Sequence, residues 1–181
     1  MSSEPKAILE KAAQIQLLVL DVDGVLTDGR LYFGNSGDEY KAFHIRDGLG
    51  IKMLQNNKIE VAIISGRRSA AVERRLKDLD VRHVYLGVTD KLAVFQELLV
   101  ELAVATSQAA FVGDDLVDLP VLQQVGLAIT VADADVFVRR HVHWQTSCSG
   151  GHGAVREVCE LLLTARGLLN AERAKYLTVS G

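Results

Sequence analysis

Two carboxylates, Asp21 and Asp23, follow directly on the apolar run 17–20 and precede Gly24. An apolar run of this length is typical of a strand buried on both faces of a parallel sheet. Ligands of open α/β sheets gather at the carboxyl ends of the strands. Two acids placed there repel each other unless a cation such as Mg²⁺, which prefers oxygen ligands, neutralises them. The alternative interpretation is an acidic turn, because Asp and Gly are common in turns.

Three further polar groups fall at the ends of predicted elements. Ser65-Gly66 ends the apolar run 59–64, Asp114 follows the run 108–112, and Lys91 opens a predicted helix. In a parallel sheet all of them should converge on one edge with Asp21. A carboxylate there can attack phosphorus, while a cation, a hydroxyl, backbone N–H groups and a lysine stabilise the phosphate oxygens. A second carboxylate can donate and recover a proton.

Strand and helix patterns alternate along the chain. The expected strands cover 17–20, 59–64, 82–86, 108–112, 127–131 and 141–145. The expected helices cover 4–14, a segment opening at 46–48, then 68–78, 91–104, 116–124, 134–139 and 154–166. Residues 30–43 read as a β-hairpin, and residues 170–181 as a polar tail with little packing signal. This alternation predicts an α/β fold, a doubly wound parallel sheet, with residues 1–181 as one domain.

Composition limits the classes of function. The chain has 181 residues, of which 49% are hydrophobic and 24% charged, with a net charge of −3. This charge offers no electrostatic support for nucleic-acid binding, and no apolar run reaches the ~18 residues of a membrane span. No signal-peptide pattern opens the chain. The two cysteines, Cys148 and Cys159, share no metal-type spacing, so we expect reduced thiols in a cytoplasmic protein.

The ordered motifs resemble a known superfamily. Asp21-x-Asp23-Gly-x-x-Thr27, Ser65-Gly66, Lys91 and Gly113-Asp114-Asp115 are similar to the four motifs of the haloacid dehalogenase superfamily. The resemblance implies a three-layer core with Asp21 as nucleophile and Mg²⁺ ligand. It implies that Asp23 is the acid/base and contacts the metal through its carbonyl. Asp114 would be the third protein ligand, supported by Asp118 or Asp115, and the phosphate would be held by Ser65, Gly66 and Lys91.

The spacing between the motifs indicates a member of the superfamily without a cap domain. Only the hairpin and one helix lie between the first two motifs, so no cap domain fits there. The hairpin, the segment 44–48, Ser65-Gly66-Arg67 and the segment 150–157 resemble the lidless 3-deoxy-D-manno-octulosonate 8-phosphate phosphatases. That family serves lipopolysaccharide precursor synthesis. Besides Asp23 and Lys91, its substrate-binding residues match Arg46, Asp47, Gly48, Lys52, Arg67 and Arg75. Lys52 departs from the pattern, because close relatives have arginine there.

The resemblance also implies a homotetramer. Without a cap the site of a monomer would be open to water, so we expect neighbouring subunits to cover it. Four aromatic residues alternate along the hairpin and are expected to form the subunit contact, namely Tyr32, Phe33, Tyr40 and Phe43. The expected partners are therefore a small sugar acid phosphate and other copies of the chain, with neither nucleic acid nor membrane.

Alternatives stay open at this level. A phosphatase for another sugar acid, such as an acylneuraminate 9-phosphate, would carry the same motifs. A phosphoreceiver module is disfavoured, because Asp23 would hasten loss of a phosphoryl group from Asp21. A non-catalytic assembly domain is disfavoured because the catalytic acids are intact. His141 and His143 could share one side of a strand, but no third metal ligand lies nearby. Asp133 and Asp135 are expected to cap a helix.

Overall fold

Apolar runs build the central sheet of the structure, a computed structural model that describes residues 3–177. Its strands are β1 (Leu17–Leu20), β4 (Glu60–Ser65), β5 (His83–Leu86), β6 (Ala109–Val112), β7 (Leu127–Thr130) and β8 (Trp144–Gln145). They lie in the order β5-β4-β1-β6-β7-β8, and every neighbouring pair is parallel. The predicted fold class, a doubly wound parallel α/β sheet, is confirmed.

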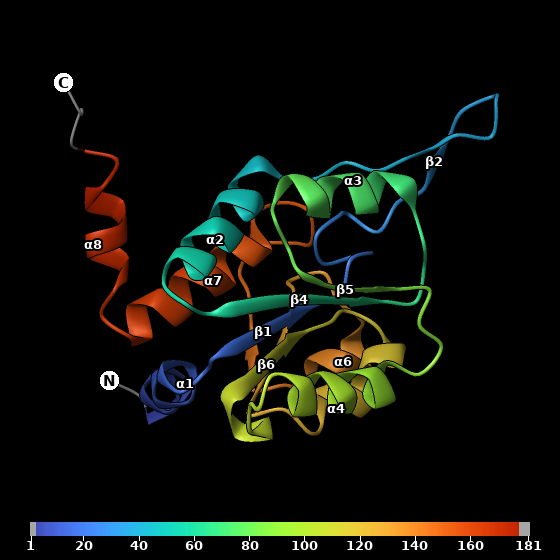
Figure 1. Ribbon diagram of the computed structural model, residues 1–181. Helices are drawn as coiled ribbons and strands as arrows, with labels where there is room; N and C mark the ends of the chain where they lie inside the picture. The colour runs from blue at the N-terminus through green and yellow to red at the C-terminus, as the bar shows by residue number, and fades with distance from the viewer. Residues whose placement is uncertain (1–2, 178–181) are drawn as a thin grey trace.

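Helices cover both faces of this sheet (Figure 1). The long ones are α1 (Ser3–Ala13), α2 (Ile45–Asn56), α3 (Ala70–Asp78), α4 (Lys91–Glu101) and α7 (Ala154–Ala165). The short ones are α5 (Leu119–Leu122), α6 (Val136–Arg139), α8 (Leu169–Ala174) and the 3₁₀ turns η1 (Thr106–Gln108) and η2 (Leu116–Asp118). Leu18 and Leu20 of β1 face the core beneath α2, α3 and α7, whereas Leu17 and Val19 face the core beneath α4. Alternate side chains thus enter two cores, which is why the run is continuously apolar.

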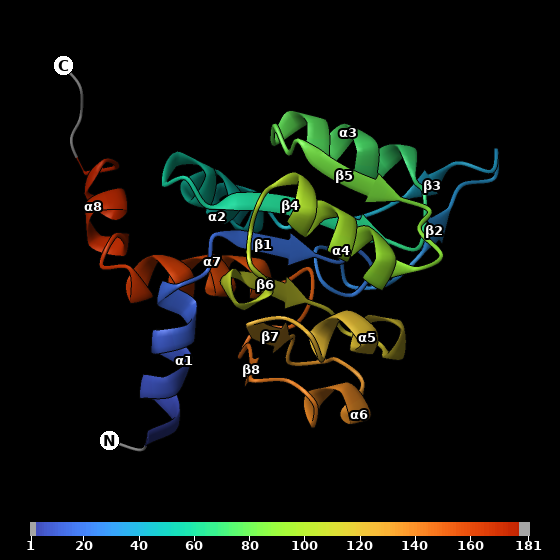
Figure 2. The same cartoon turned by 60° about the horizontal axis from the view of Figure 1, so that its bottom comes forward.

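The strand register brings the functional ends of the strands to one level. Leu20 of β1 lies opposite Ile63 of β4 and Val112 of β6. Asp21 and Gly113 therefore leave the sheet side by side, at the point where the chain order reverses on either side of β1. Figure 2 shows the strand arrows pointing toward the end of the molecule from which the hairpin projects.

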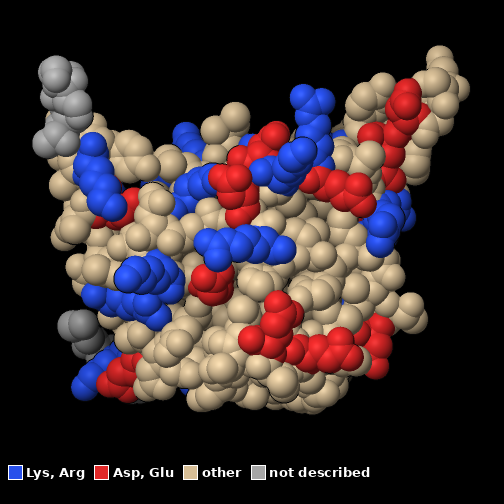
Figure 3. All heavy atoms as spheres, in the orientation of Figure 1, with Lys and Arg blue, Asp and Glu red and all other residues tan. Residues whose placement is uncertain are grey.

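The predicted hairpin forms a second, two-stranded sheet from β2 (Tyr32–Phe33) and β3 (Glu39–Tyr40). It projects as an arm of mostly uncharged atoms with acidic groups along it, whereas the body mixes positive and negative side chains (Figure 3). Tyr32, Phe33 and Tyr40 are 45%, 66% and 58% exposed. Phe43 differs from the expectation, because it packs against the core where the chain enters α2. Only three of the four hairpin aromatics are therefore free for a partner.

Three other expectations differ from the structure. The tail expected over 170–181 is in part helical, because α8 covers Leu169–Ala174, and Glu172 is buried there and accepts a hydrogen bond from Nδ2 of Asn57 at 2.9 Å. The last strand covers only Trp144–Gln145. His143 therefore precedes this strand, and its Nδ1 accepts from the Ala128 backbone at 2.9 Å. Residues 178–181 of the predicted tail lie outside the described residues. Among residues 3–177, no helix has both the length and the apolar character needed to cross a bilayer.

Candidate active site

A pocket of about 380 Å³ opens at the carboxyl edge of the sheet. It is lined by the polar residues Asp21, Asp23, Ser65, Gly66, Arg67, Thr89, Lys91, Asp114 and Asp115, together with Gly29, Val88 and Val117. The segments that follow β1, β4, β5 and β6 all contribute to this lining. The structure thus brings together the residues of all four motifs that the sequence placed at one edge of the sheet.

A tight loop after β1 holds Asp21 and Asp23 in place. The Asp21 amide donates to the carbonyl of Val112 at 3.0 Å, and the loop then turns so that the amide of Leu26 donates to Val22 at 2.9 Å. Gly24 has a φ of +86°, and a Cβ there would overlap Oδ2 of Asp114. Glycine is therefore required twice, by the backbone conformation and by the carboxylate that packs against it.

Three carboxylates lie close together at the pocket, and two of them, Asp21 and Asp114, line it. Oxygens of Asp21, Asp114 and Asp118 lie within 4.8 Å of one another. Burial, followed by the charge of Asp118, raises the pKa of Asp21 to about 6 although Lys91 acts in the opposite direction. Burial and then the charges of Asp21 and Asp118 raise the pKa of Asp114 to about 8. A cluster of oxygen ligands that repel each other in a partly buried site fits Mg²⁺.

Asp118 is held differently from the other two acids. Its Oδ1 accepts from Nζ of Lys91 at 2.7 Å, and its Oδ2 accepts from the backbone amides of Asp114 at 3.1 Å and Asp115 at 3.3 Å. Both of its oxygens are thereby engaged with protein donors. Asp118 therefore supports the loop and the lysine, whereas Asp21 and Asp114 line the pocket.

Lys91 lies between two of the acids. Its Nζ is 3.0 Å from Oδ1 of Asp21 and 2.7 Å from Oδ1 of Asp118. Burial alone would lower the pKa of Lys91, but the charges of Asp21 and Asp118 outweigh it and raise the pKa above its ordinary value. The residue also begins α4, whose N-cap Asp90 accepts from the Ala93 amide at 3.0 Å. A permanent cation is thus presented to the pocket by a helix terminus.

The loop between β4 and α3 supplies neutral donors. Ser65 is buried at the end of β4, and its carbonyl accepts from the Val88 amide at 3.0 Å, which ties the loop to the segment after β5. Gly66 and Arg67 are exposed toward the pocket. The Ser65 hydroxyl and the backbone N–H groups that follow it are suited to hold phosphate oxygens.

Two hairpin residues that belong to no motif contact side chains that line the pocket. The Nζ of Lys41 forms an ion pair with Asp23, and Arg67 donates to Oε2 of Glu39 at 2.9 Å. Neither Lys41 nor Glu39 is among the residues predicted from the sequence to form the site. Their charges face inward on a hairpin whose aromatic residues face outward, which is the one signal that could have indicated a role.

Five of the residues expected around the substrate do not line this pocket. Arg46 lines a separate cavity beside α7, Lys52 forms an ion pair with Asp80, and Arg75 packs so tightly on Gly48 that a Cβ there would overlap its guanidinium. Oδ1 of Asp47 accepts from the Arg156 amide at 2.8 Å. This carboxylate therefore caps the first turn of α7 across the tertiary structure.

The glycine-rich segment before α7 packs against the loop that follows β1. A Cβ at Gly150 would overlap the carbonyl of Gly24, and the amide of Gly151 donates to the carbonyl of Val25 at 3.0 Å. Asp133, expected as a helix cap, instead accepts from the Gly150 amide at 2.9 Å. Asp135 does cap α6, because it accepts from the Phe137 amide at 2.7 Å.

Comparisons with known proteins point to one family. No protein-family model matches the chain. The curated 3-deoxy-D-manno-octulosonate 8-phosphate phosphatase of Escherichia coli K12 is 49% identical over 170 residues, covering 94% of this chain and 90% of the relative. The crystal structure of the Moraxella catarrhalis phosphatase of that name, in complex with magnesium, phosphate and the sugar acid, is 41% identical with a TM-score of 0.91, covering 93% and 97% of the two chains. A haloacid dehalogenase superfamily hydrolase (subfamily III A) from Legionella pneumophila is 43% identical with a TM-score of 0.93, covering 96% of each chain.

Proposed function

The chain belongs to the 3-deoxy-D-manno-octulosonate 8-phosphate phosphatases of the haloacid dehalogenase superfamily, and we propose that its chemistry proceeds through an aspartyl-phosphate on Asp21. The protein is a phosphoric monoester hydrolase that uses Mg²⁺. The observation that supports the proposal best is the position of Asp21, which lies against Lys91 in the pocket at the carboxyl end of β1. We also propose a cytoplasmic role in lipopolysaccharide precursor synthesis, from the family resemblance.

Each residue has a defined part in the proposed reaction. The carboxylate of Asp21 attacks phosphorus, and the bond between phosphorus and the sugar oxygen breaks. Asp23 donates its proton to that oxygen as the sugar acid leaves. Asp23 then takes a proton from water, which attacks the phosphorus, releases phosphate and restores Asp21. Ser65, the N–H of Gly66 and the ammonium of Lys91 hold the phosphate oxygens throughout.

The metal ligands in this proposal are Asp21, Asp114 and the carbonyl of Asp23. Bound Mg²⁺ supplies charge neutralisation at the phosphate and at the attacking carboxylate. Asp118 stays outside this set, because Lys91 and two backbone amides already engage its oxygens. Its part is to keep Lys91 charged and in place.

A substrate comparison tests the function. The purified protein is assayed for phosphate release from 3-deoxy-D-manno-octulosonate 8-phosphate and from an acylneuraminate 9-phosphate, each with Mg²⁺ and with a chelator. We expect the octulosonate ester to have the higher kcat/KM, and the chelator to stop turnover of both. A preference for the nine-carbon acid would replace the proposed substrate, and full turnover in metal-free protein would contradict the metal site.

Binding of Mg²⁺ should stabilise the protein more at high pH than at low pH. The pKa of Asp21 and of Asp114 is raised in the folded state, so metal-free protein loses stability as pH rises from about 4, their ordinary value, to about 8. Metal binding removes this cost because it favours the ionised acids. We therefore expect the gain in Tm on adding Mg²⁺ to be larger at pH 8 than at pH 5, by differential scanning calorimetry. Asp114→Asn is the control and should lose most of the gain. An equal gain at both pH values would contradict the assignment.

Lys91→Ala should weaken turnover strongly. The change removes a buried cation that the proposal places on the transferring phosphate, so we expect kcat/KM to fall about 10²-fold, the scale for one such donor. It also leaves the Asp118 carboxylate buried without its partner, which costs about 3–5 kcal/mol of stability. Arg68→Ala is the matched control, because the Arg68 side chain is 73% exposed. Steady-state kinetics and thermal melts check both variants, and equal losses in the two would place Lys91 outside the site.

We propose that a neighbouring subunit covers the pocket, in a tetramer built on the exposed hairpin aromatics. Tyr32→Asp with Phe33→Asp should disperse the assembly, because unpaired charge is costly in an interface. Selectivity for the sugar acid over p-nitrophenyl phosphate should then fall. The cover that the neighbouring subunit provides over the sugar is lost, whereas the catalytic acids that act on both esters remain. Light scattering reports the assembly and paired assays the selectivity. Val100→Asp, at a position 82% exposed on α4, is the control. A dispersed protein with unchanged selectivity would show that no neighbour is needed.

A further inference from the structure

The base of the hairpin carries a buried lysine that no motif includes. Lys41 follows directly on β3, and its side chain is fully buried although Tyr40 beside it is exposed. Its Nζ forms an ion pair with Oδ1 of Asp23 and lies 3.8 Å from Oε1 of Glu39. An ammonium removed from water is costly unless it is paired. The buried ammonium of Lys41 is thus paired with Asp23, the carboxylate proposed as the acid/base.

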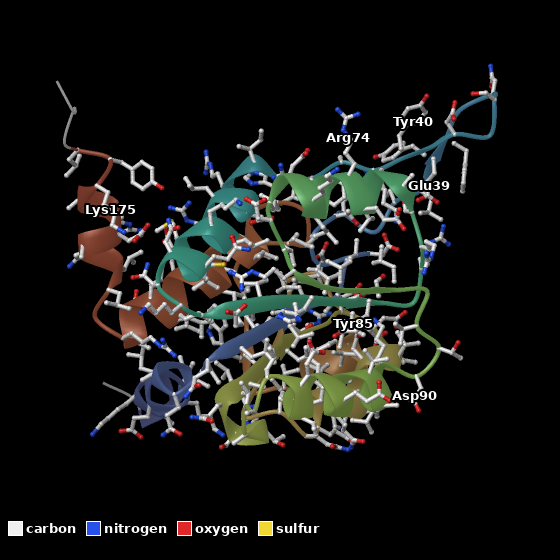
Figure 4. The ribbon with its side chains drawn as sticks, in the orientation of Figure 1. Glu39, Tyr40, Arg74, Tyr85, Asp90 and Lys175 are labelled. Atoms are coloured by element: carbon white, nitrogen blue, oxygen red, sulfur yellow. The ribbon has the colours of Figure 1, made fainter. Side chains whose placement is uncertain are left out.

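Arg67 lies near the other oxygen of the same carboxylate. Its Nε lies 3.6 Å from Oδ2 of Asp23, and its Nη2 donates to Oε2 of Glu39 at 2.9 Å. Figure 4 shows Glu39 and Tyr40 at the base of the hairpin, near the start of α3. The four side chains form a network of two cations and two anions, so their formal charges cancel. Each oxygen of Asp23 therefore faces a cation, one from the hairpin and one from the loop after β4.

A network of this kind is weak evidence for stability, because the cost of burying charges offsets their attraction. It is well suited to setting the direction of a carboxylate. A general acid must come within about 2.6–3.2 Å of the atom that it protonates. A rotation of the Asp23 carboxyl group would carry the proton away from the leaving oxygen.

We infer that Lys41 is a positioning residue, which holds the carboxyl group of Asp23 in the direction needed to protonate the oxygen of the departing sugar. This inference rests on the proposed acid/base function of Asp23. The ion pairs of Lys41 are with Asp23 and Glu39, and its proposed effect on the reaction is exerted through Asp23. Glu39 completes this network of charged side chains, because it balances the charge of Lys41 and holds Arg67 near Asp23.

Loss of a positioning lysine should affect two phosphate esters differently, whereas loss of a merely structural lysine should affect both equally. A sugar oxygen is a poor leaving group and needs the proton, whereas the phenolate of p-nitrophenyl phosphate is stable without it. The ratio kcat/KM reports only the steps up to departure of the leaving group. Loss of orientation at Asp23 should therefore lower kcat/KM for the sugar ester far more than for the nitrophenyl ester.

The experiment compares Lys41→Met, Lys41→Arg and the parent protein on both esters with Mg²⁺. We expect Lys41→Met to lower kcat/KM about 10- to 10²-fold for 3-deoxy-D-manno-octulosonate 8-phosphate, the scale of a misplaced catalytic group. The loss for p-nitrophenyl phosphate should stay below about threefold, since that ester needs little general-acid help. Lys41→Arg should recover most of the loss, because it restores the cation. Lys77→Met, an exposed lysine on α3, is the matched control and should change neither value.

Equal losses on the two esters, no loss on either, or no recovery in Lys41→Arg would each overturn the inference. Thermal melts establish that the variants are folded, and Lys41→Gln is compared in the same way if Lys41→Met does not fold. Asp23→Asn measured on the same esters separates this inference from the proposed function. If Asp23→Asn shows no difference between the esters, the acid role of Asp23 fails and the inference with it. If Asp23→Asn shows a difference between the esters and Lys41→Met shows none, only the inference about Lys41 fails.

Discussion

Asp21→Asn should abolish phosphatase turnover while leaving the fold intact. The amide keeps the shape of the side chain but is not a nucleophile, so we expect kcat to fall by about 10⁴-fold or more, as for other hydrolases that lose a nucleophile. The substitution also removes one of three neighbouring carboxylates, while Lys91 keeps its contact with Asp118 at 2.7 Å. The metal-free protein should therefore melt no earlier than the parent.

Phosphate release and thermal melts measure these two effects. Asp78→Asn, an exposed residue at the end of α3, is the matched control and should keep parental kinetics. Mass spectrometry of acid-quenched samples should find a phosphoryl adduct on a peptide containing Asp21 in the parent and none in Asp21→Asn. Parental turnover in the variant would rule out the aspartyl-phosphate route.

Asp23→Asn should slow the reaction about 10²–10⁴-fold, the usual contribution of a general acid or base. Both proton transfers of the proposed reaction depend on this residue. With p-nitrophenyl phosphate the first step needs little acid help, so we expect the aspartyl-phosphate to form and then persist because its hydrolysis lacks a base. The adduct on Asp21 should consequently reach a higher steady-state level than in the parent.

Rapid quenching followed by mass spectrometry measures that level, and steady-state assays measure the rate. The variant keeps both cations that face position 23, Lys41 and Arg67, so thermal melts should show a folded protein. Asp78→Asn again serves as the control. A parental rate with no accumulated adduct would show that another group moves the proton.

The order of elements was predictable because it depends on local pattern. Continuous apolar runs predicted strands buried on both faces, and the structure places alternate residues of β1 in two separate cores. Parallel strands share one carboxyl edge, so Asp21, Ser65 and Asp114 could be expected near each other from their positions after three such runs. The sequence also shows Gly24 after the paired acids. It does not show that a side chain at this position would overlap Asp114.

Contacts between distant segments could not be predicted in the same way. The Arg156 amide that donates to Asp47 at the start of α7 is 109 residues away in the sequence, so no local pattern predicts this contact. Part of the expected tail forms α8, where Glu172 accepts a hydrogen bond from Asn57, a contact that no local pattern predicts. The glycine turn predicts the hairpin, but Lys41 belongs to no motif, so its ion pair with Asp23 could not be predicted.

The sequence by itself thus determined the strands, their direction and the chemical groups at their ends, since these follow from apolar periodicity within a few residues. Only the tertiary structure decided which charges pair. Lys91 lies between Asp21 and Asp118, and Lys41 lies against Asp23. The physical reason is that the energy of a buried charge depends on the partners that the fold brings within a few ångströms, and those partners come from different turns of the chain.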